Sequence, residues 1–193
     1  NRMIRNTTMR GAVRVAAWGT AALGLGLTVQ AAAIPTKAAV AQILLEHAFN
    51  QGRADQRPAR PWPVADTHVT GRISVARLNV REIVLQGASG QALAYGPSVV
   101  AQRGNSQTTV VAGHRDTHFR FIRQLAVGDI VRFETVGGAT TRYRVTGFQT
   151  VRWDDFAIPA DPARPLLALA TCYPFEGKGN GPWRRVAWAE AVE

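Results

Sequence analysis

The chain has 193 residues, of which 23 are Lys or Arg and 13 are Asp or Glu, so its formal net charge is +10 at pH 7. This length suits one domain with an appendage, and a single cysteine excludes an internal disulfide. No basic run with interleaved aromatic residues occurs, so we expect no nucleic acid as a partner.

An uncharged segment near the N-terminus predicts a membrane anchor. Residues 15–34 read VAAWGTAALGLGLTVQAAAI, long enough to cross a hydrocarbon core of about 30 Å as a helix. Residues 1–14 carry four arginines, so the positive-inside rule predicts that they form a cytoplasmic basic tail and that the rest of the chain is exported. The small residues of QAAAIP leave a cleaved signal peptide open as the alternative.

A helix and a linker are predicted after this segment, over residues 35–70. Residues 37–50 place apolar side chains near helical spacing, which indicates a helix. Residues 51–67, QGRADQRPARPWPVADT, are rich in proline and polar residues and are typical of a linker. We therefore expect the folded domain to span residues 71–193.

The remainder of the chain alternates short β-type segments with turn residues. Such a series without long helices favours an all-β barrel or sandwich. One helical turn is predicted at residues 119–125. The predicted strands are residues 72–79, 82–86, 108–114, 129–135, 140–150, 166–172 and 184–192.

Three polar residues stand at the ends of predicted strands and are candidates for chemistry. His114 follows the apolar strand TVVAG, Cys172 ends the strand LLALATC, and Arg184 opens the last strand. If the last two strands form a hairpin, Cys172 and Arg184 lie at the same end of it. Cysteine is a strong nucleophile, histidine transfers protons, and arginine can stabilise an oxyanion. A structural cysteine, a packing histidine and a surface arginine remain the alternative.

Strand alternation divides residues 167–172 between two faces. The face with leucines is predicted to join the core, and the face with alanines is predicted to line an open groove for an extended peptide. The first face holds Leu167, Leu169 and Thr171, and the second holds Ala168, Ala170 and Cys172.

Three segments of the sequence resemble the sortases, which are membrane-anchored cysteine transpeptidases. TVVAGHRDTHFRFI (109–122) is similar to their histidine segment, and ALATCYPFEGKGNGPWRRV (168–186) is similar to their Thr-Cys and arginine segment. LQGASGQALAYGPSVV (85–100) adds a third stretch. The sequences TCYPF and GHRDTHF are most similar to the class GN sortases of Gram-negative bacteria.

The resemblance implies a closed eight-stranded β-barrel that cleaves an LPxTG-like sorting signal through a Cys thioester and transfers the protein to an amine acceptor. It implies Cys172 as nucleophile, His114 as general acid and base, and Arg184 as stabiliser of the oxyanion or substrate. Thr171 matches the threonine before the family's cysteine, and we expect Thr171, Ala170 and Ala168 to bind the substrate. The class implies the cytoplasmic (inner) membrane, with the catalytic domain in the periplasm.

Several alternatives stay open at this stage. Arg185 follows Arg184 directly, so the arginine assignment is ambiguous by one residue. The acids Asp154, Asp155 and Asp161 are more typical of turns than of a calcium site, so we expect no metal, and we expect no cofactor. The competing functions are a non-catalytic membrane-anchored β-barrel that binds a partner and another cysteine-dependent transpeptidase of the cell envelope.

Overall fold

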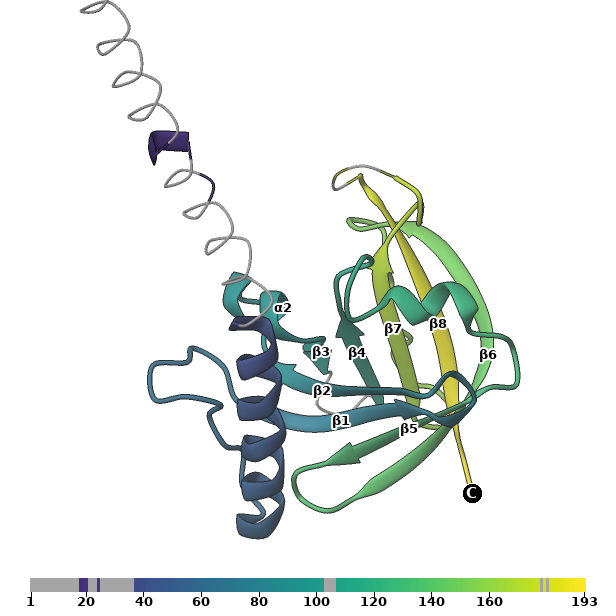
Figure 1. Ribbon diagram of the computed structural model, residues 1–193. Helices are drawn as coiled ribbons and strands as arrows, with labels where there is room; N and C mark the ends of the chain where they lie inside the picture. Colours follow the sequence, from purple (N-terminus) through teal and green to yellow (C-terminus); the bar gives the residue numbers. More distant parts are fainter. Residues whose placement is uncertain (1–17, 21–23, 25–36, 103–106, 178, 180) are drawn as a thin grey trace, which may run out of the picture. The chain divides into compact units, whose positions relative to one another are not determined.

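The central element of the structure is a closed barrel of eight strands (Figure 1). The computed structural model describes residues 18–20, 24, 37–102, 107–177, 179 and 181–193. Around the barrel the strand order is β1-β2-β3-β4-β7-β8-β6-β5, which confirms the predicted all-β fold class. The strands are β1 (Val69–Val75), β2 (Val80–Gln86), β3 (Ser98–Gln102), β4 (Thr108–Ala112), β5 (Ile130–Thr135), β6 (Thr140–Arg152), β7 (Leu166–Cys172) and β8 (Trp183–Val192).

The chain divides into two compact units, Asn1–Ala41 and Gln42–Glu193. The predicted basic tail, residues 1–14, lies outside the described residues, and so does most of the predicted membrane span, residues 15–34. In the parts of the chain that are described, we find no helix with the length and apolar character that a membrane crossing needs.

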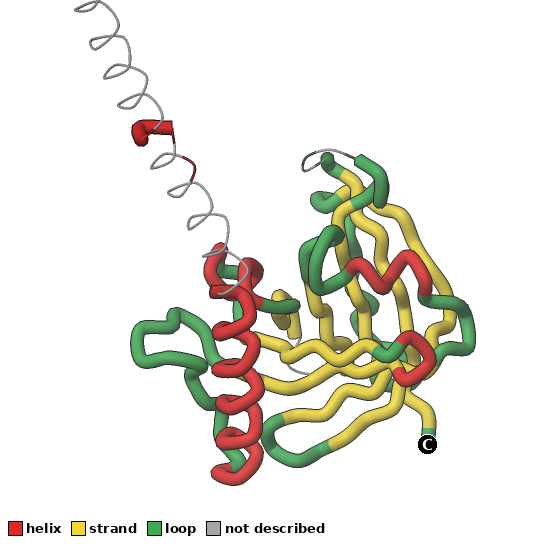
Figure 2. The backbone as a smooth tube through the Cα atoms, in the orientation of Figure 1, coloured by secondary structure: helices red, strands yellow, loops and turns green. Residues whose placement is uncertain are grey.

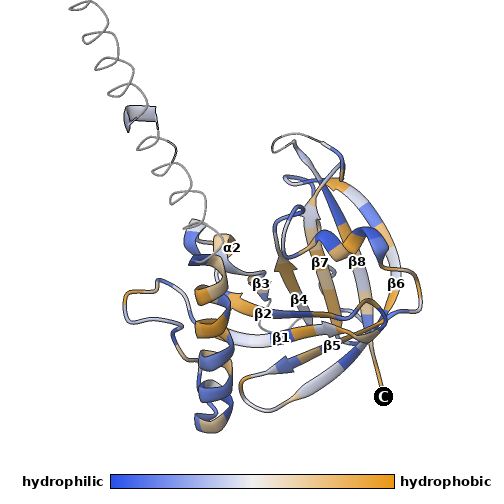
Figure 3. Cartoon of the chain, in the orientation of Figure 1, coloured by the Kyte–Doolittle hydropathy of each residue, from blue (hydrophilic) through white to orange (hydrophobic). Residues whose placement is uncertain are grey.

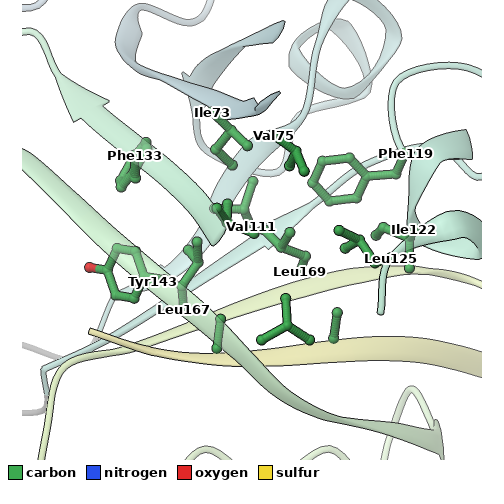
Figure 4. Packing of buried hydrophobic residues seen from close by; sticks show 14 of the residues in the cluster. Ile73, Val75, Val111, Phe119, Ile122, Leu125, Phe133, Tyr143, Leu167 and Leu169 are labelled. Carbon is green, nitrogen blue, oxygen red and sulfur yellow. The ribbon is translucent and has the colours of Figure 1, made fainter. Parts of the chain in front are cut away.

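The barrel interior is filled by side chains that alternate inward along the strands. Leu167 and Leu169 of β7 are fully buried there, as the predicted leucine face requires. Phe119, Ile122 and Leu125, in and beside the 3-10 helix η2 (Arg120–Gln124), pack into the same cluster (Figure 4). Hydrophobic residues also run along β4, which supplies buried Val111 to this core (Figure 3). The histidine segment is thereby anchored on both sides by apolar packing.

A helix over residues 37–55 precedes the barrel, and from Gln42 onward it belongs to the barrel's unit (Figure 2). Leu45, Ala48 and Phe49 form a second apolar cluster with residues of β1 and β2. The helix is longer than predicted. It continues through Gly52, where a Cβ would lie 2.8 Å from a backbone oxygen, so only glycine permits this close packing.

Ion pairs join the end of this helix to the barrel. The Glu134 carboxylate of β5 is buried and binds both Arg53 of the helix and Arg72 of β1. The Arg72 guanidinium also lies 4.5 Å from the centre of the Phe49 ring. The helix is therefore packed and paired against the barrel rather than tethered by a linker alone.

Two elements between β2 and β4 were not predicted from the sequence. The short helix α2 (Gly90–Tyr95) begins at Ser89, whose side chain accepts a hydrogen bond from the Ala92 amide at 3.0 Å. Strand β3 follows and pairs with β2 through only two residue pairs. Neither segment is long enough to display a clear helical or alternating pattern, so the sequence contained little signal for them.

A bidentate ion pair between Arg77 and Asp129 fixes the chain after η2 and makes the stability of the fold depend on pH. Arg77 donates to both oxygens of Asp129 at 2.6 Å, which lowers the pKa of that carboxyl below its ordinary value of 3.8. A carboxyl whose pKa is lowered by folding stabilises the fold at pH values above its ordinary pKa. This contribution is lost as the pH falls through the folded-state pKa. We expect Asp129→Asn to lower the Tm by several degrees at pH 7 and by progressively less below about pH 4. Thermal denaturation of both proteins across pH measures this, and an equal Tm difference at pH 7 and pH 2 would contradict it.

Candidate active site

Three neighbouring strands bring the predicted catalytic residues to one end of the barrel. β4 and β7 pair in parallel, and the last pair in register is Ala112 beside Ala170. His114 and Cys172 each follow that pair by two residues, so they leave adjacent strands side by side. β7 and β8 are antiparallel, with Cys172 directly opposite Arg184, which confirms the predicted hairpin.

The backbone before His114 is fixed against β7. The Gly113 amide donates to the Ala170 carbonyl at 3.1 Å, and the Thr171 hydroxyl donates to the Gly113 carbonyl at 2.7 Å. A Cβ on Gly113 would lie 2.8 Å from the Phe119 ring, so the close packing of that ring requires glycine. Thr171, at 2% exposure, thus acts here as a clamp between the histidine and cysteine segments.

The two adjacent arginines point to different faces of β8. Arg184 is half-buried, and its Nη1 donates to the carbonyls of Gly181 and Trp183 at 2.7 and 2.9 Å. Within the described residues its hydrogen bonds use Nη1 alone, so Nε and Nη2 can turn to a ligand. Arg185 instead stacks 5.0 Å from the Phe148 ring centre and donates to Thr150.

The three candidate residues line one mainly apolar cavity of about 340 Å³. Arg185 is not among the residues that form it. Such a cavity, lined mainly by apolar side chains and carrying a thiol, an imidazole and a guanidinium, suits an extended peptide with small or apolar side chains. Its walls are formed by Leu93, Val100, Val110, Ala112, Gly113, His114, Trp153, Phe156, Ala170, Thr171, Cys172, Arg184 and Val186.

The predicted substrate-binding residues are placed differently from one another. Ala170 lines the cavity, and Thr171 lines it while its hydroxyl is engaged with Gly113. Ala168 is fully buried and does not line it. The alanine face is covered at this point because it packs in a cluster to which Phe156, from the β6–β7 connection, and Trp188 contribute. The groove is therefore open at Ala170 and closed at Ala168.

A bulky side chain at Ala170 should block the cavity. We expect Ala170→Trp to lower kcat/KM for a peptide substrate at least about tenfold, because losing even one apolar contact in a binding pocket costs about that much. The Tm should stay close to that of the wild-type protein. Peptide turnover and thermal denaturation measure the two effects. Unfolding of the variant, or unchanged turnover, would place the peptide elsewhere.

Much of the cavity wall was not predicted from the sequence. Leu93 comes from α2, Val100 from β3, and Trp153 and Phe156 from the connection between β6 and β7. Trp153 is 62% exposed, and only the folded chain shows that it borders the cavity.

The neighbouring polar residues have local partners. Asp154 pairs with Arg152 at 3.0 Å, and no group of three or more metal-ligating side chains is found within the described ranges. His118 is largely buried, and its Nδ1 lies 2.8 Å from Oε2 of Glu82 in β2. It therefore pairs with this carboxylate and does not line the cavity.

Comparison with known proteins gives a family for this geometry. The sequence matches the sortase domain family over residues 73–192. Sortase D of Bacillus subtilis (strain 168) is 37% identical over 84 residues, which are 43% of this chain and 42% of the relative. The match therefore spans less than half of that relative's length.

Solved structures support the same fold. The pilus-related sortase C of Group B Streptococcus superimposes with a TM-score of 0.58 at 23% identity, over 70% of this chain and 72% of that one. Sortase A of Listeria monocytogenes superimposes with a TM-score of 0.56 at 21% identity, over 65% of this chain and 88% of that one. With the family match running from within β1 to the end of β8, over more than half of the sequence, the chain belongs to the sortase family.

Proposed function

We propose that the chain is a cysteine transpeptidase that cleaves an LPxTG-like C-terminal sorting signal and transfers the attached protein to an amine. The observation that carries this proposal is the convergence of His114, Cys172 and Arg184, from three adjacent strands, on one apolar cavity. Sortases as a family are cysteine transpeptidases that act on sorting signals, and this arrangement supplies the groups that such a reaction needs.

In the first half of the reaction, the Cys172 thiolate attacks the carbonyl carbon of the scissile peptide bond, after the threonine of the signal. The carbonyl oxygen becomes negatively charged, and the free nitrogens of Arg184 can donate hydrogen bonds to it. The C–N bond then breaks while His114 donates a proton to the leaving amine. The products are a thioester on Cys172 and the released C-terminal fragment.

In the second half, an acceptor amine attacks the thioester carbonyl. His114 removes a proton from the amine, Arg184 again stabilises the oxyanion, and the C–S bond breaks to regenerate the Cys172 thiolate. Water in place of the amine would hydrolyse the thioester. Because the cavity wall is mainly apolar, it favours attack by an acceptor amine that binds together with the molecule carrying it over attack by water from bulk solvent.

We further propose that residues 15–34 anchor the protein in the cytoplasmic membrane of a Gram-negative cell, with the barrel in the periplasm. The uncharged length of this segment, the arginines before it and the class GN resemblance of TCYPF and GHRDTHF support this placement. N-terminal sequencing of the mature protein from the membrane fraction tests it. A start near Ile34 would replace the anchor with a cleaved signal peptide.

The transpeptidase proposal is tested with a fluorescent peptide that carries an LPxTG-type signal and an amine acceptor. We expect two products in the chromatogram, the fragment released after threonine and the new amide with the acceptor. A peptide of the same composition in scrambled order is the control. Binding without cleavage would favour a non-catalytic β-barrel binding module.

A further inference from the structure

The residue after the catalytic histidine is a buried arginine that the proposed mechanism does not use. Arg115 is 8% exposed, although it lies in the loop between β4 and η2, and it is not among the residues that line the cavity. Taking a guanidinium out of water is costly unless its donors are satisfied. Its partners should therefore reveal what this buried charge contributes.

Its guanidinium joins the histidine loop to the segment after the cysteine. Nε and Nη2 donate to the two carboxylate oxygens of Asp116 at 3.0 and 3.1 Å. Nη1 donates to the Pro174 carbonyl at 2.7 Å, two residues beyond Cys172. Arg115 thus holds both sides of the site, from a position behind the cavity wall.

The ion pair of Arg115 with Asp116 is charged at neutral pH. The Asp116 hydrogen bond is the main reason that the pKa of Arg115 lies above its ordinary value. The pKa of Asp116 is lowered chiefly by its hydrogen bond with Arg115, so the pair stays ionised at neutral pH.

We propose that Arg115 is a positioning residue that clamps the His114 loop to the Cys172 segment without touching the substrate. The proposal rests on Cys172 being the nucleophile of the proposed reaction. The other charged or titratable groups around Cys172 are His114 on the β4 side, Arg184 opposite it on β8 and Glu176 in the following loop. Of the positive groups, Arg115 is the buried one that lies outside the cavity.

Two substitutions vary the hydrogen bonds of Arg115. Arg115→Gln removes the fork of donors that binds Asp116 and Pro174 together, and Arg115→Lys keeps a cation with three donors for the same partners. Arg120→Gln is the matched control, because Arg120 is exposed at the start of η2 and donates to the Asp116 carbonyl at 3.1 Å.

The measurements are hydrogen–deuterium exchange of the backbone amides in residues 113–119 and 173–177 of the 193-residue chain, and kcat and KM with a peptide substrate. We expect Arg115→Gln to raise exchange about tenfold in both segments together. Arg115→Lys should stay closer to the wild-type protein, and Arg120→Gln should leave exchange of residues 173–177 unchanged. With a peptide substrate, the Gln variant should lower kcat while KM changes less than about twofold, because Arg115 does not line the cavity.

Faster exchange in residues 113–119 alone would show that Arg115 does not join the two segments, and it would overturn the proposal. A lower Tm of Arg115→Gln with kcat unchanged would make Arg115 a merely structural residue and would overturn it as well. If Arg115→Gln does not fold, the comparison is made in Arg115→Lys, where a smaller rise in exchange in both segments supports the clamp and a rise in one or neither overturns it. Faster exchange in both segments of a protein that never cleaves the peptide would support the clamp while rejecting the transpeptidase function.

Discussion

Cys172→Ala should abolish peptide cleavage and transfer, with a loss of at least about 10,000-fold in turnover, because no other group in the cavity can form the thioester. Cys172 is half-buried at the end of β7, and the core side of that strand is filled by Leu167 and Leu169. Removing one sulfur atom there takes away chemistry and little packing. Turnover of the fluorescent peptide and the Tm of the variant measure the two consequences.

The Tm also serves as the control for this variant. A Tm within a few degrees of wild type shows that the lost activity is not lost structure. Cleavage by Cys172→Ala at the wild-type rate would reject the sortase-type mechanism for this chain, whatever its fold.

Arg184→Ala should lower kcat about 100- to 1000-fold, the usual cost of removing one donor to an oxyanion. Arg184 lies opposite Cys172 in the register of β7 and β8 and lines the cavity. Its loss leaves the developing negative charge without its strongest partner. Steady-state kinetics with the sorting-signal peptide measure the change in kcat separately from KM.

Arg185→Ala is the matched control, because the chain offers a second arginine one residue away on the other face of β8. Its side chain stacks on Phe148 and donates to Thr150, so we expect kcat within a few-fold of wild type and a somewhat lower Tm. If Arg185→Ala lost activity while Arg184→Ala kept it, the oxyanion donor would be Arg185 and not Arg184.

Local pattern was enough to predict most strands and one half of the site. A hairpin places the end of one strand beside the start of the next, so Cys172 and Arg184 could be paired from the sequence alone. Alternation likewise predicted the burial of Leu167 and Leu169. The choice of His114 over His118 depended on family resemblance, because neither spacing nor alternation distinguishes two histidines in one loop.

The rest of the site depends on contacts between distant segments. The parallel pairing of β4 with β7 sets His114 beside Cys172, and no local pattern encodes which strands become neighbours. Ala168 follows the predicted face, but the β6–β7 connection folds over it. Arg115 looks like any other arginine among 23 basic residues, since only the folded chain reveals its burial.

The central claim, that Cys172 becomes acylated by a sorting signal, is tested most directly by the intact mass of the protein after brief incubation with an LPxTG-type peptide. We predict an added mass equal to the peptide up to its threonine, less one water, that maps to the peptide containing Cys172 and disappears with hydroxylamine. An unmodified Cys172 in a protein that is cleaving the peptide, or an adduct on another residue, would contradict the account.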